Sequence, residues 1–146
     1  MSHTHLLYHV VFATKERFPL ISEGWEEDLY RYIAGIVKNN RGEAIESNGT
    51  RDHVHLLLRL EPVLALSDLM RDLKASSSKW VRQHHQPKFA WQRRYGAFTV
   101  SESASDAVRR YIRGQKEHHA KHRFEDEYKA LLERHRIEFE ERYLWE

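Results

Sequence analysis

The sequence contains no cysteine and no long apolar run, and both absences narrow the class of protein. Without cysteine the chain has no disulfide framework, no thiolate metal ligand and no cysteine nucleophile. No apolar stretch approaches the roughly 20 residues that span a bilayer. The start, MSHTHLLYHVVF, lacks the basic region and the small-residue cleavage site of a signal peptide. We therefore expect a cytoplasmic protein in which histidine, carboxylate or amide groups hold any metal ion.

Internal repeats and low-complexity segments are also missing, and the composition is that of one ordinary domain. The 146 residues are 40% hydrophobic and 32% charged, which excludes a disordered or membrane-embedded chain. The net charge of +2 hides an asymmetry, because residues 125–146 carry eight acidic and four basic side chains. The first 124 residues carry 20 basic and 14 acidic ones, a charge of +6. This basic part of the chain, called the body below, attracts polyanions, although many proteins of this charge never bind nucleic acid.

The order of the expected secondary-structure elements indicates an α+β fold. Alternating and β-branched runs predict four strands, over residues 6–15, 43–49, 53–60 and 96–102. Apolar residues at helical spacing predict three helices, over residues 22–39, 67–85 and 106–122. The order strand, helix, strand, strand, helix, strand is typical of a ferredoxin-like antiparallel sheet with helices on one face. Such a sheet leaves its other face free for a ligand or a partner.

The C-terminal segment differs from the rest of the chain in charge and adds one amphipathic helix over residues 124–135. Its apolar stripe is typical of a helix that packs on the body or on a second subunit. We therefore expect a domain of residues 1–123 followed by a C-terminal helical tail of residues 124–146.

Two histidines begin a strand that is otherwise built mainly of leucine, in the segment RDHVHLLLRL of residues 51–60. Side chains alternate along a strand, so His53 and His55 share one face. Buried imidazoles cost free energy without partners, and two at this spacing can grip one metal ion. A single H-x-H is nevertheless more often a pair of polar residues on a solvated face. A third ligand is needed to decide between the two interpretations.

The helix expected over residues 106–122 offers candidates for a third ligand and for a nucleophile. Tyr111 and Gln115 lie four residues apart and face the same side, beside the apolar stripe that packs on the sheet. A glutamine on an inward-facing stripe needs a polar partner, and a metal ion would serve. The alternative is that Tyr111 is an aromatic residue at the edge of the core and that Gln115 bonds to a backbone group.

Basic side chains on the second helix and in the loop after it predict a surface that binds a nucleic-acid backbone. They are Lys74, Lys79, Arg82, Lys88, Arg93 and Arg94. Trp91, like Phe89 and Tyr95, lies among these charges and can stack on unpaired bases. Anchoring of the loop to the core explains Trp91 and Phe89 equally well. Tyr95 is a second candidate nucleophile, but it lacks a helical partner such as Gln115.

Other histidines have weaker interpretations. The histidines at 118, 119 and 122 have helical spacing that can bind a metal ion, but they stand among lysines and are more typical of a solvated face. The histidines at 3, 5 and 9 have no predicted role.

Several of these segments together resemble one family. The segments are YHVVFATKERFPLI, DHVHLLL, LMRDLKASSSKW, FAWQRRYGAFTVSES and YIRGQ. They resemble the single-strand DNA transposases of the His-hydrophobic-His (HUH) class, the tyrosine transposases of the smallest bacterial insertion sequences, which are related to the REP-associated tyrosine transposases. The resemblance runs from about residue 5 to the C-terminal ERYLWE, and H-V-H followed by a Y-x-x-x-Q helix is its specific part. One departure is Arg51, where many relatives have proline.

The resemblance implies a site and a reaction. It implies that His53, His55 and Gln115 hold a divalent metal, Mg²⁺ or Mn²⁺, and that Tyr111 is the catalytic nucleophile. It implies a homodimer that cleaves and rejoins single-stranded DNA beside subterminal hairpins through a 5′-phosphotyrosine, with the tyrosine acting in its own or in the partner subunit. A phosphotyrosine retains the free energy of the diester, so no nucleotide cofactor is expected, and the sequence contains no Walker motif.

Three alternatives stay open at this point. A noncatalytic domain that binds single-stranded nucleic acid would explain the basic body and the aromatic residues. A metal-dependent nuclease or nickase would share the site without rejoining DNA. A domesticated REP-associated relative would share every site residue.

Overall fold

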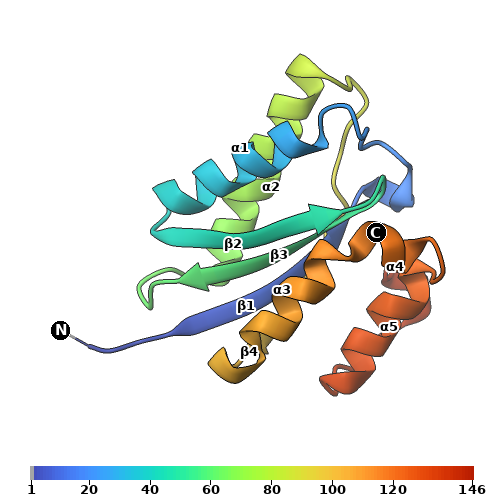
Figure 1. The fold of residues 1–146 in the computed structure, drawn as a ribbon. Helices are drawn as coiled ribbons and strands as arrows, with labels where there is room; N and C mark the ends of the chain where they lie inside the picture. The colour runs from blue at the N-terminus through green and yellow to red at the C-terminus, as the bar shows by residue number, and fades with distance from the viewer. Residues whose placement is uncertain (1) are drawn as a thin grey trace.

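Four antiparallel strands form one sheet: β1 (Leu6–Ala13), β2 (Gly42–Gly49), β3 (His53–Leu60) and β4 (Gly96–Val100). In this computed structural model, which describes residues 2–146, the spatial order of the strands is β2-β3-β1-β4 (Figure 1). The α+β, ferredoxin-like class is therefore confirmed, with β3 and β1 in the centre of the sheet. Within residues 2–146, no helix is long and apolar enough to cross a membrane.

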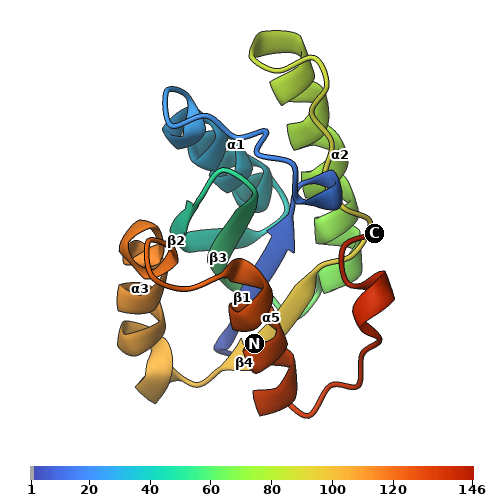
Figure 2. The same ribbon diagram turned by 90° about the vertical axis from the view of Figure 1, so that its right-hand side faces the viewer.

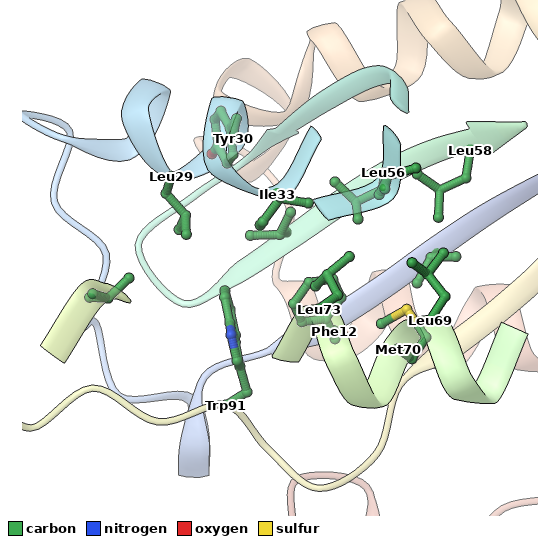
Figure 3. Packing of buried hydrophobic residues seen from close by; sticks show 14 of the residues in the cluster. Phe12, Leu29, Tyr30, Ile33, Leu56, Leu58, Leu69, Met70, Leu73 and Trp91 are labelled. Carbon is green, nitrogen blue, oxygen red and sulfur yellow. The ribbon is translucent and has the colours of Figure 1, made fainter. Parts of the chain in front are cut away.

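The first face of the sheet carries α1 (Glu26–Asn39) and α2 (Leu66–His84), as the sequence predicted. Alternate side chains of the central strands, such as Phe12 and Leu56, pack against apolar residues of both helices (Figure 3). Leu29 and Ile33 of α1 and Leu69 of α2 are fully buried in this layer. Each buried side chain of this size contributes about 1.5–3 kcal/mol relative to leaving it exposed. This face supplies most of the aliphatic core.

The second face of the sheet is covered as well, which differs from the free face that the sequence predicted. It carries α3 (Ser105–Arg113), the short α4 (Gln115–His119) and α5 (Phe124–Arg134). Figures 1 and 2 show these helices on the side of the sheet opposite α1 and α2. Phe124, Tyr128 and Leu131 of α5 form a buried cluster with Val11 and Phe98 of the sheet. The expected strand-and-helix order was right, but the apolar stripes of α3 and α5 need partners and find them on this face.

The single helix expected over residues 106–122 is broken. Gly114 separates α3 from α4 and has φ −86° and ψ 12°, outside the helical region. Glycine is a poor helix former, so a break costs little at this position. The Asn48 side-chain amide donates to the Arg113 carbonyl oxygen at 3.0 Å, which satisfies one backbone group at the break. As a result Gln115 begins a new helix instead of continuing the old one.

Residues after α5 also contact the body, among other places through two hydrogen bonds. The Gln92 side-chain amide donates to the Leu144 carbonyl oxygen at 3.2 Å, and the Arg93 backbone amide donates to the Glu146 carbonyl oxygen at 2.7 Å. The division of the chain after residue 123 stays a prediction.

Candidate active site

His53 and His55 lie on the second face of the sheet and are fully buried. Ala13 and Val11 of β1 pair with them in register, and these smaller neighbours leave room for two imidazole rings. Val54 points to the opposite face and belongs to the aliphatic core. The alternative that these histidines are two polar residues on a solvated face is therefore wrong.

Both rings are oriented through their Nδ1 atoms. His53 Nδ1 lies 2.8 Å from the Asp52 carboxylate, and His55 Nδ1 lies 2.8 Å from His9 Nε2. A carboxylate accepts the Nδ1 proton of His53, which leaves Nε2 as the atom with a free lone pair. Such contacts are typical of metal-binding histidines, whose remote nitrogen is held by a hydrogen-bond partner. His9, for which the sequence predicted no role, is thus part of the site.

Gln115 and Tyr111 reach the same place from α4 and α3. Gln115 is fully buried, and its Oε1 lies 3.2 Å from His53 Nε2. The Tyr111 hydroxyl donates to a carboxylate oxygen of Glu127. The structure therefore brings together all four residues that the sequence singled out for chemistry, although Gly114 interrupts the helix on which the pattern was expected. Their catalytic and metal-binding roles stay predictions.

Glu127 of α5 lies at the centre of the site, and sequence reasoning missed it. Its side chain is only 2% exposed. Oε1 lies 2.9 Å from His55 Nε2 and 3.1 Å from His119 Nε2, while Oε2 accepts hydrogen bonds from Tyr111 and, at 3.2 Å, from Gln115 Nε2. The available signal was an acidic residue inside an apolar stripe, since Glu127 lies between Phe124 and Tyr128 on the inward side of α5.

Burial and hydrogen bonding set the charges in the site. Burial alone would raise the pKa of Glu127, but hydrogen bonds from His119 and His55 outweigh burial and hold this pKa well below its usual range. Burial, reinforced by the charges of neighbouring histidines, lowers the pKa of His9 to about 3 and that of His55 to about 4. Burial and the hydrogen bond to Glu127 raise the pKa of Tyr111. At neutral pH the centre thus holds the charged Glu127 carboxylate, neutral imidazoles at His9 and His55, and a protonated tyrosine.

The donor set fits a divalent cation. One nitrogen or oxygen each of His53, His55, His119 and Glu127 lies within 4.8 Å of all the others. The Gln115 amide donates through its nitrogen to Glu127, so its oxygen faces His53 Nε2, and two lone pairs then point into the same space. A cation between these atoms would remove that conflict.

The predicted DNA-binding residues divide into two groups. Lys79, Arg82, Lys88, Arg93 and Arg94 are exposed on α2 and the following loop. Lys74 is half-buried, which lowers its pKa to about 8, and its Nζ lies 3.3 Å from the Arg94 carbonyl oxygen.

Trp91 does not belong to that surface. It is 8% exposed, its ring centroid lies 4.6 Å from that of Phe12, and its indole nitrogen donates to Ser77 Oγ at 2.9 Å. Trp91 and Phe89 therefore anchor the loop to the core, and these contacts favour anchoring over base stacking for Trp91, whose part in DNA binding stays a prediction.

A hollow of about 630 Å³ lies beside His119, and the sequence did not predict it. Its lining contains five basic side chains and three acidic ones: Arg17, Arg51, Lys116, Lys121 and Arg123, with Glu23, Glu26 and Asp52. A second hollow of about 520 Å³ is lined by Glu127, Tyr111, His9 and His118 among others. The first hollow thus borders the centre at His119, and the second borders it at Glu127 and Tyr111.

Comparison with known proteins agrees with this geometry. The family model described as "Transposase IS200 like" matches residues 2–115. The ISDra2 transposase TnpA of Deinococcus radiodurans is 27% identical over 117 residues, which cover 75% of this chain and 84% of that protein. A crystal structure assigned as a transposase from Deinococcus radiodurans has a TM-score of 0.64 and 27% identity, and the match covers 78% of this chain and 93% of that chain.

A further solved structure is that of a REP-associated tyrosine transposase bound to a REP hairpin. Its TM-score is 0.58 at 13% identity, and the match covers 77% of this chain and 68% of that chain. At this identity the likeness concerns the fold alone. The family match ends at Gln115, so it includes His53, His55 and Tyr111 and leaves Glu127 outside.

Proposed function

The chain belongs to the IS200-like transposase family, and from this premise we propose that it cleaves and rejoins single-stranded DNA through a 5′-phosphotyrosine at Tyr111. One observation carries the proposal. The Tyr111 hydroxyl, the Gln115 amide and the imidazole of His55 all contact the carboxylate of Glu127. A noncatalytic binding domain would have no need to bury these groups around one point.

His53, His55 and Gln115 are the residues that would hold Mg²⁺ or Mn²⁺. Two imidazoles and an amide are neutral, so the ion would keep its charge and polarise a phosphate oxygen as a Lewis acid. The contacts of Asp52 with His53 and of His9 with His55 would keep both rings in place.

Tyr111 would supply the nucleophile. Its raised pKa means that it rests as a phenol, so the proton must leave as the oxygen attacks phosphorus. The Glu127 carboxylate already accepts the hydrogen bond from that phenol and is placed to take the proton. A bond then forms between the tyrosine oxygen and the 5′ phosphate, and the 3′ oxygen leaves and becomes a hydroxyl. Attack by another 3′ hydroxyl on the phosphotyrosine restores the diester and the tyrosine.

The basic hollow is the proposed path of the single strand. Arg51, Lys121 and Arg123 line it, and His119 connects it to the centre. Lysine and arginine side chains in such a groove attract the phosphate backbone without reading sequence. The exposed basic side chains of α2 and its loop form a separate surface, which we assign to the subterminal hairpin.

The proposal includes the subunit that supplies the nucleophile. Tyr111 and the histidine pair meet within one chain, which supports cleavage of DNA by a tyrosine of the same subunit. The homodimer stays a prediction.

A denaturing gel tests the proposal. The full chain is incubated with Mn²⁺ and with labelled single-stranded hairpin oligonucleotides taken from the DNA that flanks its gene. We expect a labelled protein band with the wild type and with Tyr95→Phe, and no band with Tyr111→Phe. Tight binding of these oligonucleotides without any covalent band would favour the noncatalytic alternative, and a band that persists in Tyr111→Phe would exclude Tyr111 as the nucleophile.

A further inference from the structure

We propose that His119 and Glu127 complete the metal centre as two further ligands, so that the ion is held by side chains of β3, α4 and α5. The inference rests on the proposed function, because it assumes that His53 and His55 bind the ion. It extends that site by two residues that lie beyond the part of the chain matched by the family model.

Distances are the first argument. Glu127 Oε1 lies 2.9 Å from His55 Nε2, 3.1 Å from His119 Nε2 and 3.8 Å from His53 Nε2. Atoms that are each about 2.1 Å from one cation are separated from one another by about 3 to 4 Å. The carboxylate oxygen is thus spaced from each of the three imidazole nitrogens as two ligands of one ion are, and all four atoms lie within 4.8 Å of one another.

The orientation of His119 is the second argument. Its Nδ1 lies 2.9 Å from the His122 carbonyl oxygen, which accepts the Nδ1 proton and turns Nε2 toward Glu127. The same arrangement occurs at His53, whose Nδ1 faces Asp52. A histidine on a solvated face needs no such support, whereas a metal-binding imidazole usually has it.

Burial is the third argument. The side chain of Glu127 is 2% exposed and that of His119 is 10% exposed. A carboxylate in such a position is costly unless charged or hydrogen-bonding partners surround it. Histidine and tyrosine contacts supply partners in the absence of an ion, and a divalent cation would supply a stronger one. The added imidazole would also favour Mn²⁺ over Mg²⁺, which prefers oxygen ligands and keeps its water.

The test is Mn²⁺ binding to the full, metal-free chain without DNA, measured by titration calorimetry and by the electron paramagnetic resonance signal of free Mn²⁺. The two decisive variants are His119→Ala and Glu127→Gln. The matched controls are His122→Ala, a nearby histidine outside the cluster, and Glu133→Gln, an exposed glutamate on α5. His53→Ala tests the proposed function itself.

We expect Kd to rise by at least about 10-fold in His119→Ala and Glu127→Gln, since loss of even a supporting residue typically costs 10- to 100-fold. Both controls should bind Mn²⁺ like the wild type. A second readout is hydrogen exchange, because bound metal should slow exchange of α5 amides in the wild type and not in Glu127→Gln.

Wild-type affinity in both decisive variants, together with lost binding in His53→Ala, would overturn this inference and leave the proposed function standing. Tighter binding by Glu127→Gln would also overturn it, because the carboxylate would then compete for the position of the ion. No binding by the wild type would overturn both. Unfolding midpoints without metal identify a variant that fails to fold. If Glu127→Gln is such a variant, His119→Ala, at the rim of the site, decides the question.

Discussion

The two faces of the sheet are built from the same strands, but the first face forms the aliphatic core and the second holds a cluster of polar side chains. On the first face β1 and β3 present residues such as Val10 and Leu56 to α1 and α2, and the layer is apolar throughout its centre. On the second face the neighbouring residues His9 and His55 contact each other, and His55 contacts a buried carboxylate from α5. A step of one residue along a strand therefore separates a side chain that stabilises the fold from one placed for chemistry. Substitutions one residue apart on a strand should therefore have different effects: on the first face they should lower stability, and on the second face they should lower activity.

Among substitutions on the second face, Tyr111→Phe is expected to have the largest effect on activity. Loss of the nucleophile should slow DNA cleavage by at least about 10⁴-fold, as the removal of covalent nucleophiles does elsewhere. The free energy of unfolding should fall by about 1.5–3 kcal/mol, since one hydrogen bond to the charged Glu127 carboxylate is lost, and the protein should stay folded. Single-turnover cleavage assays and urea unfolding measure the two quantities. A loss of folded protein large enough to explain the lost activity would contradict a role of Tyr111 in the reaction itself.

The next effect compares neighbours on β3. Leu56→Ala should lower the free energy of unfolding by about 2–5 kcal/mol, because it leaves a cavity in the aliphatic layer. The fraction that stays folded should cleave DNA at the normal rate. His55→Ala should lose metal-dependent cleavage in protein that is still folded. Equal loss of cleavage per folded molecule in both variants would show that the two faces do not differ in function.

The pH dependence of stability is expected to come from the second face. His9 and His55 have pKa values of about 3 and 4 when folded, below the ordinary 6.5, so the unfolded chain binds protons that the folded chain does not. Their contribution is complete above pH 6.5 and is lost as the pH falls toward 4, by up to about 1.4 kcal/mol per pH unit for each histidine.

Urea unfolding of metal-free protein between pH 7 and 4 measures this slope. His9→Gln should reduce the slope, and His3→Ala, at an exposed position, should leave it unchanged. A slope that is the same in His9→Gln would contradict burial of a neutral His9 as its cause.

The smallest effect concerns the basic hollow. Lys121→Ala should weaken binding of single-stranded DNA several-fold for every sequence. The slope of the logarithm of the binding constant against the logarithm of the salt concentration should become shallower by about one, because one fewer counterion is released. Lys38→Ala, on α1 above the first face, should change neither quantity. Fluorescence anisotropy over a series of salt concentrations measures both. Equal effects of the two substitutions would indicate binding that is not confined to the second face.

Local sequence patterns predicted the strands and the residues of the site well. They did not predict which helices cover the two faces of the sheet. HVHLLLRL forms β3 over the residues expected, because alternation and β-branching act within one strand. Tyr111 and Gln115 meet the histidines as their spacing suggested, although Gly114 breaks the helix between them.

The misses come from contacts between distant segments. Glu127 reaches His55 across 72 positions of the chain, and nothing in the local sequence names that partner. The covered second face has the same origin, since the apolar stripe of α5 packs on strands far away in sequence. Trp91 was ambiguous because an aromatic residue among basic ones fits both stacking and anchoring, and the contact with Ser77 favours anchoring.

The most direct test of the account is the site of covalent attachment. After incubation with Mn²⁺ and a cleavable single-stranded hairpin oligonucleotide, the wild-type protein is digested and the peptide that carries the nucleotide adduct is identified by mass spectrometry. We expect a phosphodiester adduct on Tyr111 and on no other residue. An adduct on Tyr95, or cleaved DNA without any protein adduct, would contradict it.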